Sequence, residues 1–159
     1  MKLAIVYYSE TGNTQKAAEL IREGMEQVKG IQVEMFALDQ VNADDLADAK
    51  AVVFGAPTFY ADTCWQMKKW FDETKISLCG KLGAVFGTAA YLQGGCEVGL
   101  QNNLVRMMCK GMVCYSGGTA AGQPPTHLGA LALDGHVEEQ KDQFIAFGAR
   151  IAQKAVELF

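Results

Sequence analysis

The sequence has few prolines and histidines and no cluster of basic residues. It contains three prolines and two histidines in 159 residues, and its net charge of -4 at pH 7 comes without a basic cluster. A nucleic acid or an anionic membrane surface is therefore not expected as a partner. No apolar stretch approaches membrane-spanning length, and Met1 runs directly into an apolar segment, which leaves no room for a signal peptide. We expect a cytoplasmic protein.

The five cysteines form no recognisable metal or disulfide pattern. Their number is odd, their spacing is irregular and no Cys-x-x-Cys pair occurs, which argues against a disulfide framework and against a zinc site. Cys79 and Cys114 lie beside or within apolar runs, so we expect small core residues there. Cys64 and Cys96 are expected near helix starts, where a thiolate is favoured, but we interpret both as packing residues.

The sequence is rich in apolar residues arranged in short runs. Half of the residues are hydrophobic and a fifth are charged, which is typical of a globular chain, and the length suits a single domain over residues 1–159. Continuous apolar runs at residues 3–8, 51–56, 82–87 and 112–115 predict strands buried on both faces. Residues 31–36 alternate apolar and polar, which predicts an edge strand, and residues 128–133 could add a brief strand.

Apolar residues at helical spacing fill the intervals between these runs. They predict helices at residues 15–29, 42–49, 64–74, 97–110 and 137–158. Met108 is expected to point inward from the fourth of these helices. Strands that alternate with helices indicate βαβ units, so we predict an α/β fold in which a parallel sheet carries helices on both faces.

The turn after the first buried run is Ser9-Glu10-Thr11-Gly12-Asn13-Thr14. The unpaired N–H groups and the dipole of the following helix favour an anion at this position. Gly12 allows a positive φ, and the turn offers three hydroxyl groups and one amide but no Lys or Arg, so neutral dipoles would hold a phosphate. The alternative is that Thr11 or Asn13 merely caps the helix, for which one such residue suffices.

Two well-known phosphate loops do not match this turn. The nucleoside-triphosphate loop needs Gly-x-x-x-x-Gly-Lys followed by Ser or Thr, and no glycine here is followed by that pair. The dinucleotide fingerprint needs three spaced glycines after the strand, whereas this turn has one.

Two further loops follow buried runs and are rich in small, hydroxyl or aromatic residues. Pro57, which is expected to end its strand, opens a loop with Thr58, Phe59 and Tyr60, and Asp62 or Thr63 is the expected cap of the next helix. The other loop contributes Thr88, Ala89, Ala90, Tyr91, Gly94 and Gly95. Parallel sheets bind ligands beyond the carboxyl ends of their strands, where strand order reverses. We therefore expect all three loops to converge on one ligand.

The first loop resembles that of the flavodoxin superfamily, Thr/Ser-x-Thr-Gly-x-Thr, which wraps the phosphate of FMN. The segment from Gly55 to Thr74, Gly94-Gly95-x-Glu97 and Gly111-Met112-Val113 are similar to one branch, the flavodoxin-like NAD(P)H:quinone oxidoreductases. The resemblance implies a flavodoxin-like, doubly wound, five-stranded parallel sheet with FMN as cofactor. It places the phosphate on residues 9–14, the flavin ring against Thr58, Phe59 and Tyr60, and the far edge of the ring near residues 88–95.

The sequence departs from this branch in three places. An aromatic residue, Phe59 or Tyr60, stands where Arg is expected after Thr58, and Cys109-Lys110 replaces the His that precedes Gly-Met. The segment 116–125 is shorter than the one that helps to build tetramers, so a homo-oligomer is an open alternative. His127 could steer protons at the flavin, but we favour the interpretation that it is simply solvated.

The resemblance makes an FMN-dependent oxidoreductase the leading hypothesis and an electron carrier the alternative, and a binding or regulatory module without turnover is a third possibility. In the first, NAD(P)H reduces FMN and a quinone or similar small molecule then takes two electrons, with no catalytic side chain required because the cofactor carries the chemistry. In the second, the chain is an electron carrier between redox protein partners. Tyr60 and Tyr91 favour the carrier because they could cover the ring, whereas the mild charge disfavours it.

Overall fold

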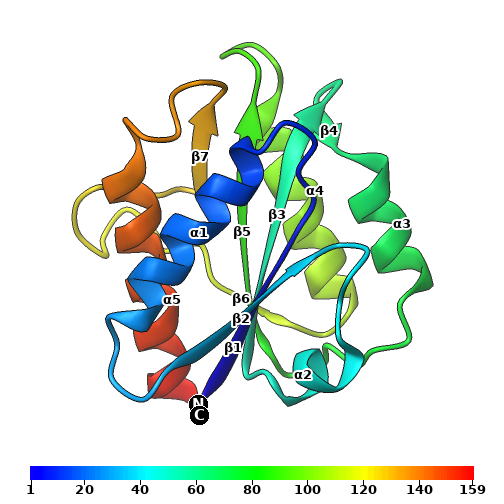
Figure 1. Cartoon of the computed structure of the whole chain (residues 1–159), viewed down its shortest axis with the longest axis vertical. Helices are drawn as coiled ribbons and strands as arrows, with labels where there is room; N and C mark the ends of the chain where they lie inside the picture. The colour runs from blue at the N-terminus through cyan, green and yellow to red at the C-terminus, as the bar shows by residue number, and fades with distance from the viewer.

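The computed structural model describes residues 1–159 and is built around a parallel sheet (Figure 1). The strands lie in the order β2-β1-β3-β5, and both β6 and β7 pair with β5 on its free side. The strands are β1 (Lys2–Tyr7), β2 (Gln32–Ala37), β3 (Ala51–Phe59), β4 (Asp62–Thr63), β5 (Leu82–Ala89), β6 (Val113–Cys114) and β7 (Ala130–Leu133). As predicted, β1, β3 and β5 are buried and β2 is an edge strand with one exposed face.

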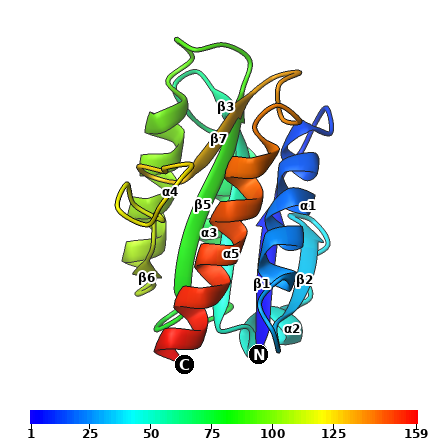
Figure 2. The same cartoon turned by 90° about the vertical axis from the view of Figure 1, so that its left-hand side faces the viewer.

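Helices cover both faces of the sheet, as the alternation of runs predicted (Figures 1 and 2). One face packs against α1 (Asn13–Glu26) and α5 (Lys141–Leu158), and the other packs against α2 (Ala43–Asp48), α3 (Trp65–Glu73) and α4 (Cys96–Cys109). Alternate residues of each central strand point to opposite faces, so every buried strand contributes to two separate cores. None of the helices is both long and apolar enough to cross a membrane.

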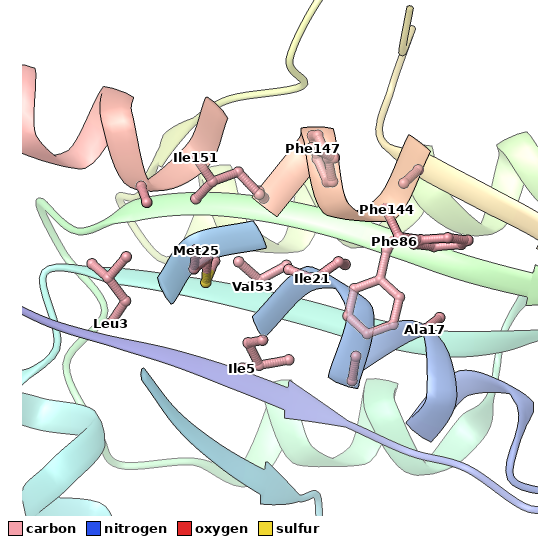
Figure 3. Close-up of a cluster of buried hydrophobic side chains, with 14 of the residues drawn as sticks. Leu3, Ile5, Ala17, Ile21, Met25, Val53, Phe86, Phe144, Phe147 and Ile151 are labelled. Atoms are coloured by element: carbon pink, nitrogen blue, oxygen red, sulfur yellow. The ribbon is translucent and has the colours of Figure 1, made fainter. Parts of the chain in front are cut away.

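The core under α1 and α5 brings the two ends of the chain together (Figure 3). Ile21 and Met25 of α1 and Phe144 of α5 pack over Ile5 and Phe86 of the sheet. The helices approach so closely that a Cβ atom built on Gly148 would lie 2.1 Å from the carbonyl oxygen of Ile21. The middle of α1 is therefore packed directly against the backbone of α5 on this face of the sheet.

The strand order reverses between β1 and β3, which are neighbours although β2 lies between them in the sequence. Their following segments leave from the same edge of the sheet in opposite directions, which opens a crevice at that edge. The segment after β5 leaves from the next strand along. Figure 1 shows all three segments together at the top of the molecule.

Two predictions for the segment after the second buried run are wrong because the chain forms a short antiparallel hairpin there. The strand does not end at Pro57: β3 continues to Phe59 and turns back antiparallel into β4, where Thr58 pairs with Thr63. Because Asp62 and Thr63 belong to β4, the N-cap position of α3 is occupied by Cys64, whose side chain makes no capping hydrogen bond.

The fifth position of the sheet is divided. β6 pairs with the beginning of β5, and the buried run expected at residues 112–115 is a strand only at Val113–Cys114. The brief strand expected at residues 128–133 is confirmed as β7, which pairs with the end of β5. Val113 is about half exposed because it lies at the sheet edge. Two other expected core residues also face solvent: Met108, whose neighbour Met107 is buried instead, and Cys79.

Candidate functional site

The segment between β1 and α1 is a tight turn stabilised from within by Ser9. The Ser9 hydroxyl oxygen accepts hydrogen bonds from the backbone N–H groups of Gly12 and Gln15, both at 3.2 Å. Gly12 adopts a φ of 91° immediately before the helix, a conformation that glycine reaches without strain. Neither Thr11 nor Asn13 accepts a hydrogen bond from a backbone N–H group of the first helical turn, so the alternative in which one of them is merely a cap is wrong.

The same turn presents hydrogen-bond donors that have no acceptor in the chain. The backbone N–H groups of Thr11, Asn13 and Thr14 are not used in any hydrogen bond. Donors at a helix start point outward along the helix axis and add to its positive end. This donor set fits a phosphate held by uncharged groups, because no Lys or Arg lines the cleft beside it.

A pair of buried hydroxyl groups joins the first loop to the third. The Thr14 and Thr88 hydroxyl oxygens are 2.8 Å apart, and both residues are almost fully buried. One hydroxyl hydrogen is enough for this bond, so the pair keeps a second hydrogen for another acceptor. The bond fixes the start of α1 against the end of β5.

Two connected clefts lie among the three loops. The inner cleft, with a volume of about 140 Å³, is lined by Glu10, Thr11, Asn13, Thr14, Pro57, Thr58, Phe59, Thr88, Ala89, Ala90 and Asp134. The outer cleft, with a volume of about 360 Å³, is lined by Thr58, Tyr60, Ala61, Ala89, Ala90, Tyr91, Gln93 and Gly94. Because Thr58, Ala89 and Ala90 line both, one elongated ligand could occupy the two clefts together.

Two exposed aromatic residues line the outer cleft. Tyr60 is fully exposed at the tip of the β3–β4 hairpin, with a φ of 49°, and Tyr91 is 65% exposed on the loop after β5. Neither ring is buried by the protein itself. Both are therefore free to contact a flat ligand or the surface of another molecule.

The β3–β4 hairpin is held against α4 by side-chain hydrogen bonds and by close backbone packing. The Asp62 carboxylate accepts hydrogen bonds from its neighbour's N–H group at 2.6 Å and from the Asn102 side chain at 2.8 Å. Asn103 donates to the buried Thr63 hydroxyl at 3.0 Å. Gly95, at the start of α4, packs so closely that an added Cβ atom would lie 2.4 Å from the Cβ atom of Ala61.

The structure brings together most of the residues that the sequence singled out. Thirteen of them line the two clefts, whereas Ser9, Gly12 and Gly95 shape the loops without lining either cleft. Sequence reasoning missed Ala61, Gln93 and Asp134. The first two lie inside or beside predicted loops, but no local signal marks Asp134, which follows β7 far along the chain.

His127 and Cys109 lie outside both clefts. His127 lines a separate groove of about 580 Å³ between α4, β7 and the start of α5. Cys109 is the last residue of α4, close to the bond between Gly80 and Gly111 at the beginning of β5. It is thus at the opposite end of the sheet from the three loops.

The two cysteines near helix starts are buried thiols. Burial raises the pKa of Cys64, and burial together with the neighbouring Glu97 raises the pKa of Cys96. Both side chains therefore stay protonated at neutral pH, which supports their interpretation as packing residues.

A family model, curated proteins and solved structures that resemble this chain all include flavodoxins. The family model described as "Flavodoxin" matches residues 5–101. A flavodoxin from Clostridium saccharobutylicum is 42% identical over the whole of both chains. An NAD(P)H dehydrogenase (quinone) from Geotalea uraniireducens is 32% identical over 71% of this chain and 70% of its own length. The solved structure of a flavodoxin from the domain Archaea superposes with a TM-score of 0.81 at 28% identity, covering 98% of this chain and 99% of that one.

Proposed function

Since this chain belongs to the flavodoxin family, its cofactor is FMN, and we propose that it is an electron carrier that passes electrons between redox protein partners. The observation that carries this proposal is the match of the whole chain to a flavodoxin of the same extent. Residues 1–159 then form one FMN-binding domain. FMN supplies the electron chemistry when bound, and the protein binds it and tunes it.

In this proposal the FMN phosphate lies in the inner cleft at the start of α1. Thr11, Asn13 and Thr14 offer free backbone N–H groups there, and the buried Thr14–Thr88 pair offers one further hydroxyl hydrogen. Neutral donors at a helix start are sufficient for a dianion. The ribityl chain would pass Thr58, Ala89 and Ala90, which line both clefts.

The flavin ring then lies in the outer cleft between residues 58–60 and 88–95. Tyr60 and Tyr91 line this cleft and are exposed, so in this proposal they stack on the ring. A ring covered on its faces excludes a nicotinamide but leaves an edge for a protein partner. This arrangement supports single-electron transfer at the edge over hydride transfer at the face.

A second candidate is an FMN-dependent NAD(P)H:quinone oxidoreductase, in which the partners are small molecules. It is favoured by the relative named NAD(P)H dehydrogenase (quinone) and by the similar second loop from Gly55 to Thr74. The net charge of only -4 is also milder than the acidic docking faces that steer carriers to their partners.

An anaerobic redox titration separates the two candidates. The purified chain should be yellow and should release FMN, not FAD, on denaturation. For a carrier, dithionite reduces the flavin in two separate one-electron steps, whereas NADH and NADPH leave it oxidised. Full bleaching by NADH or NADPH, with colour restored by a quinone, would instead establish the oxidoreductase. A colourless protein that does not take up added FMN would overturn both.

A further inference from the structure

A carboxylate occupies one wall of the inner cleft, where the proposed function places a dianion. Asp134 is the first residue after β7, and its backbone N–H donates to the Ala89 carbonyl oxygen at 2.8 Å. This bond fixes Asp134 beside the end of β5. Its side chain lines the inner cleft together with Glu10 and the hydroxyl residues.

Asp134 also takes up a donor that a phosphate could use. The Asn13 amide nitrogen donates to the Thr11 hydroxyl at 3.1 Å and to the Asp134 carboxylate. A side-chain amide carries two hydrogens, so both donors of Asn13 are used within the chain. An amide in the middle of the anion-binding turn therefore faces a carboxylate.

No cation compensates Asp134. It makes no salt bridge, and Lys16, on the second turn of nearby α1, pairs with Glu138 at 3.1 Å instead. Asp134 is exposed, so water screens its charge in part, but a dianion in the same cleft would still be repelled. The neutral donors of the turn would thus act against a fixed negative charge.

We propose that the Asp134 carboxylate stands in for the FMN phosphate in the empty chain and lowers the affinity for FMN by competing for Asn13 and by repelling the dianion. This inference rests on the phosphate position given under the proposed function. Asp134 is a positioning residue for Asn13 and a determinant of how readily FMN exchanges. Its removal should strengthen cofactor binding, whereas most changes to a binding cleft weaken it.

Asp134→Asn tests the charge at constant shape, since the new amide oxygen can still accept from Asn13. The dissociation constants of FMN and of riboflavin are measured on the refolded, cofactor-free chain by quenching of flavin fluorescence. Asp134→Asn should lower the constant for FMN about fivefold, the size expected for like charges near a protein surface. Riboflavin has no phosphate, so its constant should stay unchanged. The gain for FMN should shrink at high salt.

Asp142→Asn is the matched control. It removes the same charge, but Asp142 lies in the first turn of α5 and does not line the cleft. Equal FMN affinities of the two variants would overturn the proposal, and so would an equal change for riboflavin. A second measurement uses inorganic phosphate as the ligand. Its binding is followed by the amide NMR signals of residues 9–14 as phosphate is added. If FMN fails to bind the native chain, the proposed function falls. In that case the proposal for Asp134 is tested by phosphate alone. It is overturned if phosphate binds Asp134→Asn and Asp142→Asn equally or binds neither of them.

Discussion

The inner and outer clefts meet at Thr58, Ala89 and Ala90, yet they are built in different ways. The inner cleft is small, lies against a helix start fixed to the core, and contains a buried pair of hydroxyl groups. The outer cleft is more than twice as large and is flanked by two exposed tyrosines on loop tips. We infer that the rigid inner cleft determines whether FMN stays bound, and that the outer cleft determines how the ring reacts and what it meets.

The difference follows from how each region satisfies its polar groups. In the inner cleft, Ser9 and Thr14 make internal bonds that hold the backbone donors in place before any ligand arrives. Such preorganisation reduces the entropy lost on binding. In the outer cleft, the side chains of Tyr60 and Tyr91 form no hydrogen bond within the chain, so they remain adaptable. Substitutions in the two clefts should therefore have distinct consequences.

The largest effect is expected from Thr14→Val in the inner cleft. It removes a hydroxyl from the proposed phosphate site, and a hydrogen bond to a charged group is worth about 1.5–3 kcal/mol. FMN affinity should fall by that amount, measured by fluorescence titration. An unchanged FMN affinity would mean that the phosphate does not bind at the Thr14 hydroxyl. Thr11→Val should act in the same direction.

The double variant Thr14→Val/Thr88→Val separates binding from folding in the inner cleft. Either single change leaves one buried hydroxyl without its partner, which costs stability, whereas replacing both is nearly neutral. The double variant should regain the stability of the native chain in urea unfolding but not its FMN affinity. Thr119→Val, on an exposed loop, is the control for a lost hydroxyl elsewhere. If the double variant regained both the stability and the FMN affinity of the native chain, the inner cleft would not be the site that holds FMN.

A smaller effect is expected from Gly95→Ala, which pushes the two sides of the outer cleft apart. The added methyl group would meet Ala61 at 2.4 Å, and the φ of 77° is itself strained for alanine. Gly135→Ala is the matched control, because its φ is 74° but no atom lies within 4 Å of the new Cβ. Thermal unfolding should show Gly95→Ala to be less stable than the control by about 1–2 kcal/mol. Equal losses of stability in Gly95→Ala and Gly135→Ala would mean that the contact between Gly95 and Ala61 does not hold the β3–β4 hairpin.

The smallest effect on stability is expected from Tyr60→Ala and Tyr91→Ala. Exposed side chains without partners usually contribute within about 0.5 kcal/mol to folding, so unfolding of the empty chain should not change. Stacking of an aromatic pair is worth about 0.5–1.5 kcal/mol, so riboflavin affinity should fall by up to that amount. A tyrosine whose loss leaves riboflavin affinity and the flavin midpoint potentials unaltered does not contact the ring.

The sequence predicted the fold class through local patterns, and the same patterns indicated where a candidate site lies. Apolar runs and helical spacing predicted β1, β3, β5 and the helices between them, and the structure confirms these elements with shifts of a few residues. The position of the loops at one edge followed because parallel strands all end there. Predictions failed where pairing or packing overrode the local pattern, as when the short hairpin with β4 extended β3 beyond Pro57 and when Met107 rather than Met108 entered the core.

The sequence by itself determined that a helix start with neutral donors follows a buried strand, since both features are encoded within residues 3–29. Only the tertiary structure decided that Asp134 faces Asn13 across that turn. The two residues are separated by 121 positions, and their contact depends on the pairing of β7 with the end of β5. Local sequence patterns carry no information on such a register, because it is set by how the helices and the divided fifth strand pack around the sheet.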